Sequence, residues 1–188
     1  AELLPRVLVA TDLPHRVEGI EAALRGVPAA TAAPLCWGDV QAVAGLCREH
    51  FGSEGAEVVL CSDCLYTNWS DNLGGALAET VAAALLPTRE SVALIAYLPR
   101  CAQHEAKFFD RAHELGLDEV PLPQPRGLTS APEATGFPPE ELSRVRLLKF
   151  RWALPAQRRP LVMPRRQPPA RTARVMWPGT ACPEKKKK

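Results

Sequence analysis

The sequence has 188 residues, of which 46% are hydrophobic and 23% charged, a composition ordinary for one globular domain with a sizeable core. No stretch approaches about eighteen uncharged apolar residues, and the N-terminus lacks the basic and apolar regions of a leader, so we expect neither a transmembrane helix nor a signal peptide. Six scattered cysteines are typical of reduced thiols in an intracellular protein rather than of a disulfide framework.

The net charge of +2 hides two parts of opposite sign. Residues 1–154 carry 13 Lys or Arg against 20 Asp or Glu, whereas residues 155–188 carry 10 against 1 and hold 7 of the 19 prolines. A segment with few apolar residues, many prolines and one sign of charge cannot repay the entropy of ordering. We therefore predict a folded domain over 1–154 and a disordered basic tail over 155–188. Charge alone would let the tail contact nucleic acid or acidic surfaces, although a solvated extension explains it as well.

Short apolar runs alternate with helical patterns along the folded part. The predicted strands are 6–10, a short strand after the alanines 29–33 that ends at 35–39, then 57–61, 91–97, 118–122 and 144–152. The predicted helices are 15–25, 39–51 with Asp39 as its cap, 72–86, and 103–115 with Gly116 as its stop. A Pro/Gly-rich loop, 123–139, separates the last two strands.

This alternation predicts an α/β fold with a mostly parallel sheet, helices on both faces, and an antiparallel pair at one edge. In such sheets ligands bind beyond the carboxyl ends of the strands. The residues at or just after predicted strand ends, which we expect to gather on one rim, are Asp12, Trp37, Ser62, Asp63 and Tyr97.

Two cysteines, Cys61 and Cys64, flank Ser62-Asp63 at a spacing that metal and redox sites use. A structural zinc site usually shows a second pair at similar spacing, and the sequence has none. We therefore predict no metal site and no thiol redox chemistry here.

The succession VLVATDLP, PLCWGD, EVVLCSDCLYTNWSDNLGGALAETVAAALLP, SVALIAYLPRCAQHEAKFFDRAHELGL and VRLLKFRW resembles the seven-strand, S-adenosylmethionine-dependent protein-lysine methyltransferases of methyltransferase family 16, especially the methyltransferase-like 21 group. The resemblance covers residues 6–152. Its most specific piece is an Asp-x-x-Tyr signature, Asp63-Cys64-Leu65-Tyr66, between an apolar strand and a long helix. It implies a Rossmann-like fold and S-adenosyl-L-methionine as cofactor.

The resemblance assigns cofactor contacts to three residues. Asp12 would accept hydrogen bonds from the ribose hydroxyls, unless Thr11 or Asp12 is merely an N-cap for the helix that follows. Trp37 would line the adenine pocket, unless it is simply a core residue. Ser62 would allow close approach of the cofactor at the floor of the cleft.

Catalysis would fall to Asp63 and Tyr66. Methyl transfer needs a neutral amine, and a carboxylate raises the pKa of a nearby lysine, so Asp63 would attract and orient the ammonium while Tyr66 supplies an aromatic wall. Asp63 has an alternative role as an N-cap. Tyr97 would border the substrate channel or be a partly buried interface residue. Arg100 and His104 would contact substrate or belong to an exposed charged face.

Such enzymes have another strand and a glycine-rich loop before the strand at VLVATDLP, and here only AELLP precedes it. We therefore predict a seven-strand methyltransferase sheet that lacks its first, central strand, with weak or absent cofactor binding. The expected function is methylation of lysine in a non-histone protein of the chaperone or translation-factor class, by a monomer in the cytoplasm or nucleus. The alternatives are a non-catalytic protein-interaction module derived from a methyltransferase, and a methyltransferase acting on RNA or a small molecule.

Overall fold

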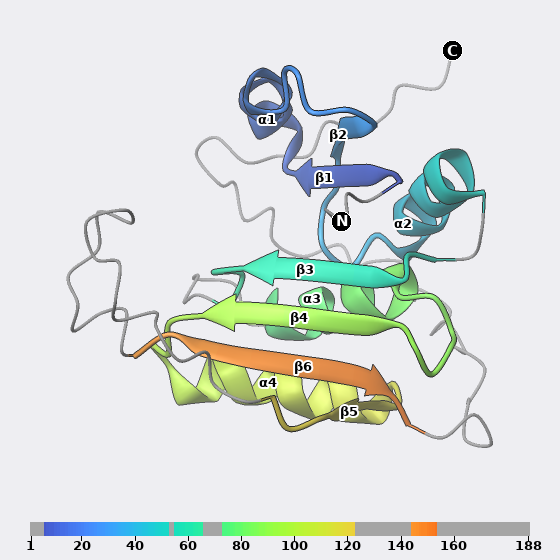
Figure 1. The fold of residues 1–188 in the computed structure, drawn as a ribbon. Helices are drawn as coiled ribbons and strands as arrows, with labels where there is room; N and C mark the ends of the chain where they lie inside the picture. Colours follow the sequence, from blue (N-terminus) through green and yellow to red (C-terminus); the bar gives the residue numbers. More distant parts are fainter. Residues whose placement is uncertain (1–5, 53–54, 66–72, 123–143, 154–188) are drawn as a thin grey trace, which may run out of the picture.

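The computed structural model describes residues 6–52, 55–65, 73–122 and 144–153 (Figure 1). The predicted basic tail and the loop 123–139 lie outside these ranges. The elements in chain order are β1 (Leu8–Asp12), the 3-10 turn η1 (Pro14–Arg16), α1 (Val17–Ala23), β2 (Ala30–Pro34), α2 (Val40–Leu46), the π-helical turn η2 (Cys47–Phe51), β3 (Val58–Ser62), α3 (Leu73–Ala84), β4 (Val92–Tyr97), α4 (Ala102–Glu114), β5 (Leu117–Glu119) and β6 (Arg146–Trp152).

The described strands form two sheets instead of one. In the first, β1 pairs with β2 in parallel; in the second, the order is β3-β4-β6-β5. The pair β3–β4 is parallel, and β6 runs antiparallel to both β4 and β5. Figure 1 shows β1 and β3 pointing the same way, with no described strand between them. The described residues therefore leave a break in the sheet between β1 and β3.

The antiparallel pair at one edge is confirmed, because β5 is an edge strand paired with β6. The sheet is less parallel than predicted. Because β6 pairs with β4 as well as with β5, half of the described strand pairings are antiparallel. Two predicted helix boundaries are confirmed. Asp39 Oδ1 accepts the Ala42 N–H at 3.0 Å and caps α2, and Gly116, at φ 86°, follows the end of α4.

The main core lies between the four-stranded sheet and the helices α3 and α4. Phe108 of α4 is fully buried and meets Phe150 of β6 edge-on, with ring centroids 5.5 Å apart. An ion pair between Arg111 and Glu79, 2.8 Å long, joins α4 to α3. The other buried members of this core are Leu65, Leu77, Ala78, Val81, Ala82, Leu85, Ala93, Ile95, Tyr97, Ala112, Leu117 and Leu148.

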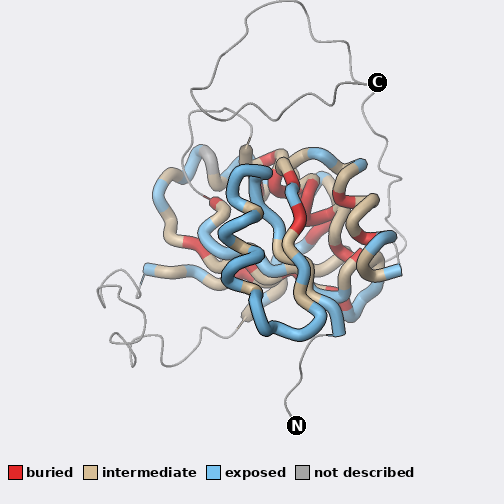
Figure 2. The backbone as a smooth tube through the Cα atoms, turned by 90° about the horizontal axis from the view of Figure 1, so that it is seen from above, coloured by how far each residue is buried: buried red, intermediate tan, exposed pale blue. Residues whose placement is uncertain are grey.

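The N-terminal unit is packed far less tightly. The helix α1 has no buried residue, and Figure 2 shows its tube mostly exposed, in contrast to the buried layer of the main core. A small second cluster, Leu35, Val43 and Cys47, lies beside α2. No helix among the described residues is long and apolar enough to cross a membrane.

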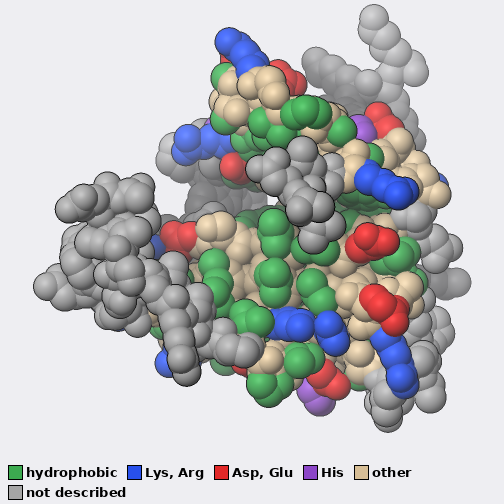
Figure 3. Space-filling model, viewed as in Figure 1, with side chains coloured by type: hydrophobic (Ala, Val, Ile, Leu, Met, Phe, Trp, Pro, Cys, Tyr) green, Lys and Arg blue, Asp and Glu red, His purple; other side chains and the backbone are tan. Residues whose placement is uncertain are grey.

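One face of the four-stranded sheet carries no helix from the described residues. Along β3 the exposed positions alternate, and Val58 and Leu60 are 53% and 70% exposed. Figure 3 shows hydrophobic side chains gathered over β3, β4 and β6 on this side. The prediction of helices on both faces is therefore wrong for this sheet within the described residues, because the two large helices α3 and α4 both pack on the opposite face.

Candidate functional site

The carboxyl ends of β1, β3 and β4 lie on one rim, together with the start of the antiparallel strand β6. We call this edge the carboxyl rim. It carries Asp12 at the end of β1 and Ser62-Asp63 at the end of β3. Because parallel strands present their carboxyl ends to the same side, the rim brings together residues that are distant in sequence.

Asp12 is the last residue of β1 and is exposed. Its Oδ1 accepts the N–H of Leu13 at 2.6 Å, and its backbone carbonyl accepts the N–H of Leu35 at 2.8 Å. The turn η1 has Leu13 as its N-cap and α1 has Arg16, both without a capping side-chain bond. The alternative role of Thr11 or Asp12 as a side-chain N-cap is therefore wrong.

Trp37 lies in the loop between β2 and α2, is partly buried, and packs against the main core. The next residue, Gly38, has φ 86° and donates its N–H to Thr80 Oγ1 of α3 at 2.8 Å. A Cβ on Gly38 would stand 3.3 Å from the Ala76 Cβ, so the loop lies very close to α3. Trp37 thus combines a core contact with partial exposure.

Asp63 continues the sheet for one residue beyond β3, because its N–H donates to the carbonyl of Ala96 at 2.7 Å. Its φ of 50° is left-handed, a conformation that Asp tolerates better than most residues and that turns the chain away from the strand. Both carboxylate oxygens accept hydrogen bonds from Arg100, at 2.8 and 3.0 Å. Ser62, beside it, is exposed at the end of β3.

The two cysteines that flank Ser62-Asp63 are both free thiols. The Cys61 thiol donates to the Cys64 sulfur, which lowers the pKa of Cys64 and, together with burial, raises the pKa of Cys61. The negative charges of Asp63 and Asp12 both oppose ionisation of Cys64. Two of the predicted site carboxylates therefore act together to raise the pKa of Cys64, against the effect of the hydrogen bond. Within the described residues no group of His, Cys, Asp and Glu is arranged to hold a metal ion.

Tyr97, at the end of β4, is only 2% exposed and belongs to the main core. Burial, followed by the negative charge of Glu105, raises the pKa of its phenol, whereas a hydrogen bond with Arg146 lowers it. The ring therefore packs beneath the rim. Tyr66 and the side chain of His104 lie outside what the structure describes, so the geometry of the Asp63–Tyr66 pair stays a prediction.

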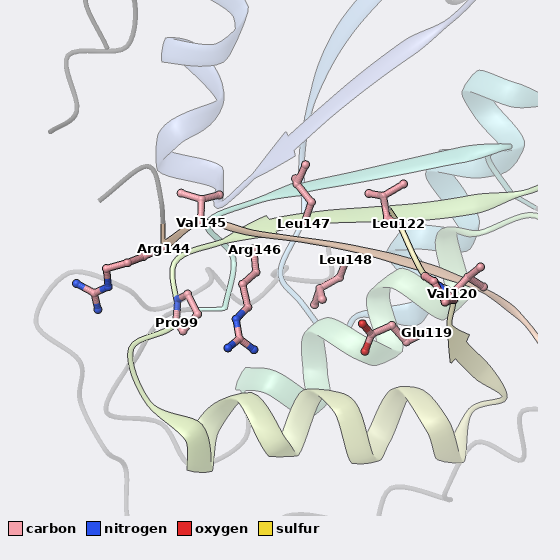
Figure 4. A pocket seen from close by; sticks show the side chains of 10 residues that line it. Pro99, Glu119, Val120, Leu122, Arg144, Val145, Arg146, Leu147 and Leu148 are labelled. Carbon is pink, nitrogen blue, oxygen red and sulfur yellow. The ribbon is translucent and has the colours of Figure 1, made fainter. Parts of the chain in front are cut away.

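A concave region of about 970 Å³ lies along the start of β6 and the chain that follows β5, beside this rim. Figure 4 shows Arg146 and Glu119 pointing to the α4 side of the sheet, whereas Val145 and Leu147 point to the other side. The lining residues are Pro99, Glu119, Val120, Pro121, Leu122, Arg144, Val145, Arg146, Leu147 and Leu148. One lining residue of the cavity, Pro99, directly precedes Arg100 of the Asp63–Arg100 pair in the sequence.

Sequence reasoning missed three residues of this rim and the cavity beside it. Arg146 and Glu119 carried no signal, because their positions depend on β6 pairing with β4 and with β5 respectively. Thr80, which holds the Trp37 loop, lies inside an alanine-rich helix. Its one available signal was that Thr80, with Glu79 beside it, is polar in a largely apolar helix.

Comparison with known proteins gives no matching family model and no matching curated protein. Among solved structures, the selenomethionine-substituted CurJ carbon methyltransferase is similar, with a TM-score of 0.51 and 14% identity. The match covers 78% of this chain but 42% of that protein, so the chain spans less than half of its length. At this identity the likeness shows the fold alone: the chain has a Rossmann-like, methyltransferase-type α/β fold.

Proposed function

We propose that this chain is part of an S-adenosylmethionine-dependent protein-lysine N-methyltransferase acting on a non-histone protein. The observation that carries the proposal is the position of Asp63. This residue follows the strand β3 of a methyltransferase-type fold, and its exposed carboxylate binds a cationic side chain with both oxygens. The Asp-x-x-Tyr signature adds support, since its first residue is this same Asp63, directly after β3.

The adenosine end of the cofactor fits the residues present. Asp12 ends β1 with an exposed carboxylate that can accept hydroxyl hydrogen bonds, and Trp37 is a partly exposed aromatic in the loop after β2. The methionine end has no comparable match, because in the described ranges no run of glycines follows a strand. When bound, the cofactor supplies an activated methyl group on a sulfonium.

The chain's own residues would hold and orient the amine. A lysine near the rim is attracted as an ammonium by Asp63, then must lose its proton before its nitrogen lone pair can form a bond to the methyl carbon while the carbon–sulfur bond breaks. A bare carboxylate would oppose that proton loss by stabilising the ammonium. The role that fits Asp63 is therefore orientation rather than deprotonation at rest.

The test uses the full 188-residue chain in a cell lysate with methyl-labelled cofactor. Asp63→Asn keeps the size of the side chain and removes its charge, and we expect at least a tenfold loss of labelled protein from the lost orientation of the amine. Asp110→Asn, an exposed carboxylate on α4, is the matched control and should label as the parent does. An Asp63→Asn protein that labels normally would refute the role of Asp63.

A second candidate is a non-catalytic protein-interaction module. The specific observation in its favour is the break between β1 and β3, because in a methyltransferase sheet the cofactor lies across the centre. Calorimetry with S-adenosylmethionine separates the two candidates. Measurable binding supports the enzyme, whereas absent binding together with absent labelling favours the module.

A further inference from the structure

The ion pair between Asp63 and Arg100 sits where the substrate amine is proposed to bind. Arg100 Nη1 donates to Asp63 Oδ1 at 2.8 Å and Nη2 donates to Oδ2 at 3.0 Å, a two-pronged arrangement that occupies both oxygens. The Arg100 side chain is 36% exposed and the Asp63 side chain is 55% exposed. The carboxylate is therefore engaged, yet both partners remain accessible to an incoming cation.

The backbone on each side of this pair is held independently of it. The sheet bond from the Asp63 N–H to Ala96 fixes one partner. On the other side, Glu105 Oε1 accepts the N–H groups of Arg100 and Cys101 at 2.9 and 3.0 Å, which fixes the start of α4. Loss of the Arg100 guanidinium contact would consequently leave Asp63 in place and its carboxylate free.

Exposed ion pairs are also weak. Measured contributions of such pairs correspond to a factor of about 1.5 to 5 in an equilibrium constant. A cation delivered by a docked protein can therefore compete with Arg100 for the carboxylate.

We propose that Arg100 is an internal occupant of the cation site at Asp63, and that the lysine ammonium of the bound protein replaces it. Arg100 is in this sense a positioning residue that holds the carboxylate ready and keeps it neutralised until substrate arrives. The identity of the cation as a lysine ammonium rests on the proposed function. The existence of the site rests on the geometry of Asp63 and Arg100.

The test needs neither the cofactor nor the target protein. The full chain, labelled with ¹⁵N, is titrated with butylammonium chloride, which copies the lysine side chain, and with sodium chloride at matched ionic strength. We expect butylammonium to move the Arg100 Nε–H signal toward its position in Asp63→Asn, beyond the effect of sodium. Arg111, which pairs with Glu79 and Glu114, is the internal reference and should respond equally to both salts.

Arg100→Gln supplies the quantitative arm. With the competitor removed, the butylammonium concentration at half-response of the Asp63 amide should fall about 1.5- to 5-fold below that of the parent. Arg89→Gln removes an exposed arginine at the amino end of β4 and should leave the midpoint unchanged. The double variant Asp63→Asn, Arg100→Gln should show no response.

The outcomes separate this proposal from the proposed function. Signals that move no more with butylammonium than with sodium in the parent and in Arg100→Gln overturn the cation site. A response to methylguanidinium chloride without one to butylammonium overturns the lysine assignment. A normal butylammonium response in a protein that neither binds nor uses the methyl donor would refute only the proposed function.

Discussion

The Gly38 N–H donates to Thr80 Oγ1 at 2.8 Å, and this bond ties the loop that carries Trp37 to the middle of α3. Thr80 is 7% exposed, and its hydroxyl donates in turn to the Ala76 carbonyl at 2.9 Å. The hydroxyl thus serves as acceptor and donor at once. One side chain of α3 thereby links the main core to the proposed cofactor side of the rim.

Replacing Thr80 by Val should lower the free energy of unfolding by about 1–3 kcal/mol, because the Gly38 N–H loses its partner in a place with little water. Thr80→Ser keeps the hydroxyl and should cost about 1 kcal/mol or less. Urea denaturation of both variants is the measurement. A larger loss for Ser than for Val would show that the methyl group, and not the hydrogen bond, matters.

The break between the two sheets should be visible in amide hydrogen exchange. Because the Asp63 N–H faces β4 and strand amides alternate in direction, Cys61 also faces β4 while Leu60 and Ser62 face the edge toward β1. We expect the Leu60 amide to exchange about 100-fold faster than the Cys61 amide. Similar protection at both positions would mean that another strand pairs with β3 in solution.

The thiol pair should show an ordered reactivity. The hydrogen bond from Cys61 lowers the pKa of Cys64 below the ordinary 9.0, whereas burial raises the pKa of Cys47. Alkylation with iodoacetamide, followed by peptide mass spectrometry across pH, should therefore give Cys64 a midpoint below that of Cys47. In Cys61→Ala the Cys64 midpoint should rise, and an unchanged midpoint would contradict the thiol–thiol bond.

Tyr97 should make the fold sensitive to alkali. Burial and the charge of Glu105 raise its pKa above 10.0, so the folded protein keeps the phenol proton longer than the unfolded chain does. The stabilisation is fully present below pH 10 and is lost as pH rises through the raised pKa, since the unfolded phenol ionises first. Denaturant unfolding between pH 9 and 11 should therefore show a steeper loss for the parent than for Tyr97→Phe (pH range set by the ordinary tyrosine pKa of ~10). Parallel slopes would argue against a buried phenol.

Local structure was largely predictable from the sequence. The strand SVALIAY became β4, and the spacing of 103–115 became α4, with Phe108 and Ala112 buried as its periodicity requires. Ala106, also in this helix, is exposed. The capping role of Asp39 was also readable, because it depends on residues three positions apart.

The sequence by itself determined the alternation of elements, their caps and the order in which Asp12, Trp37 and Asp63 reach strand ends, since these follow from neighbours a few residues apart. Only the tertiary structure decided that β6 inserts between β4 and β5, that Tyr97 is buried under the rim, and that Arg100 is the partner of Asp63. Those contacts join residues distant in sequence, such as Asp63 and Arg100, which are 37 positions apart, or depend on which strand becomes a neighbour. No local pattern of side chains encodes them, because the path of the connecting chain and the competition for hydrogen bonds decide them together.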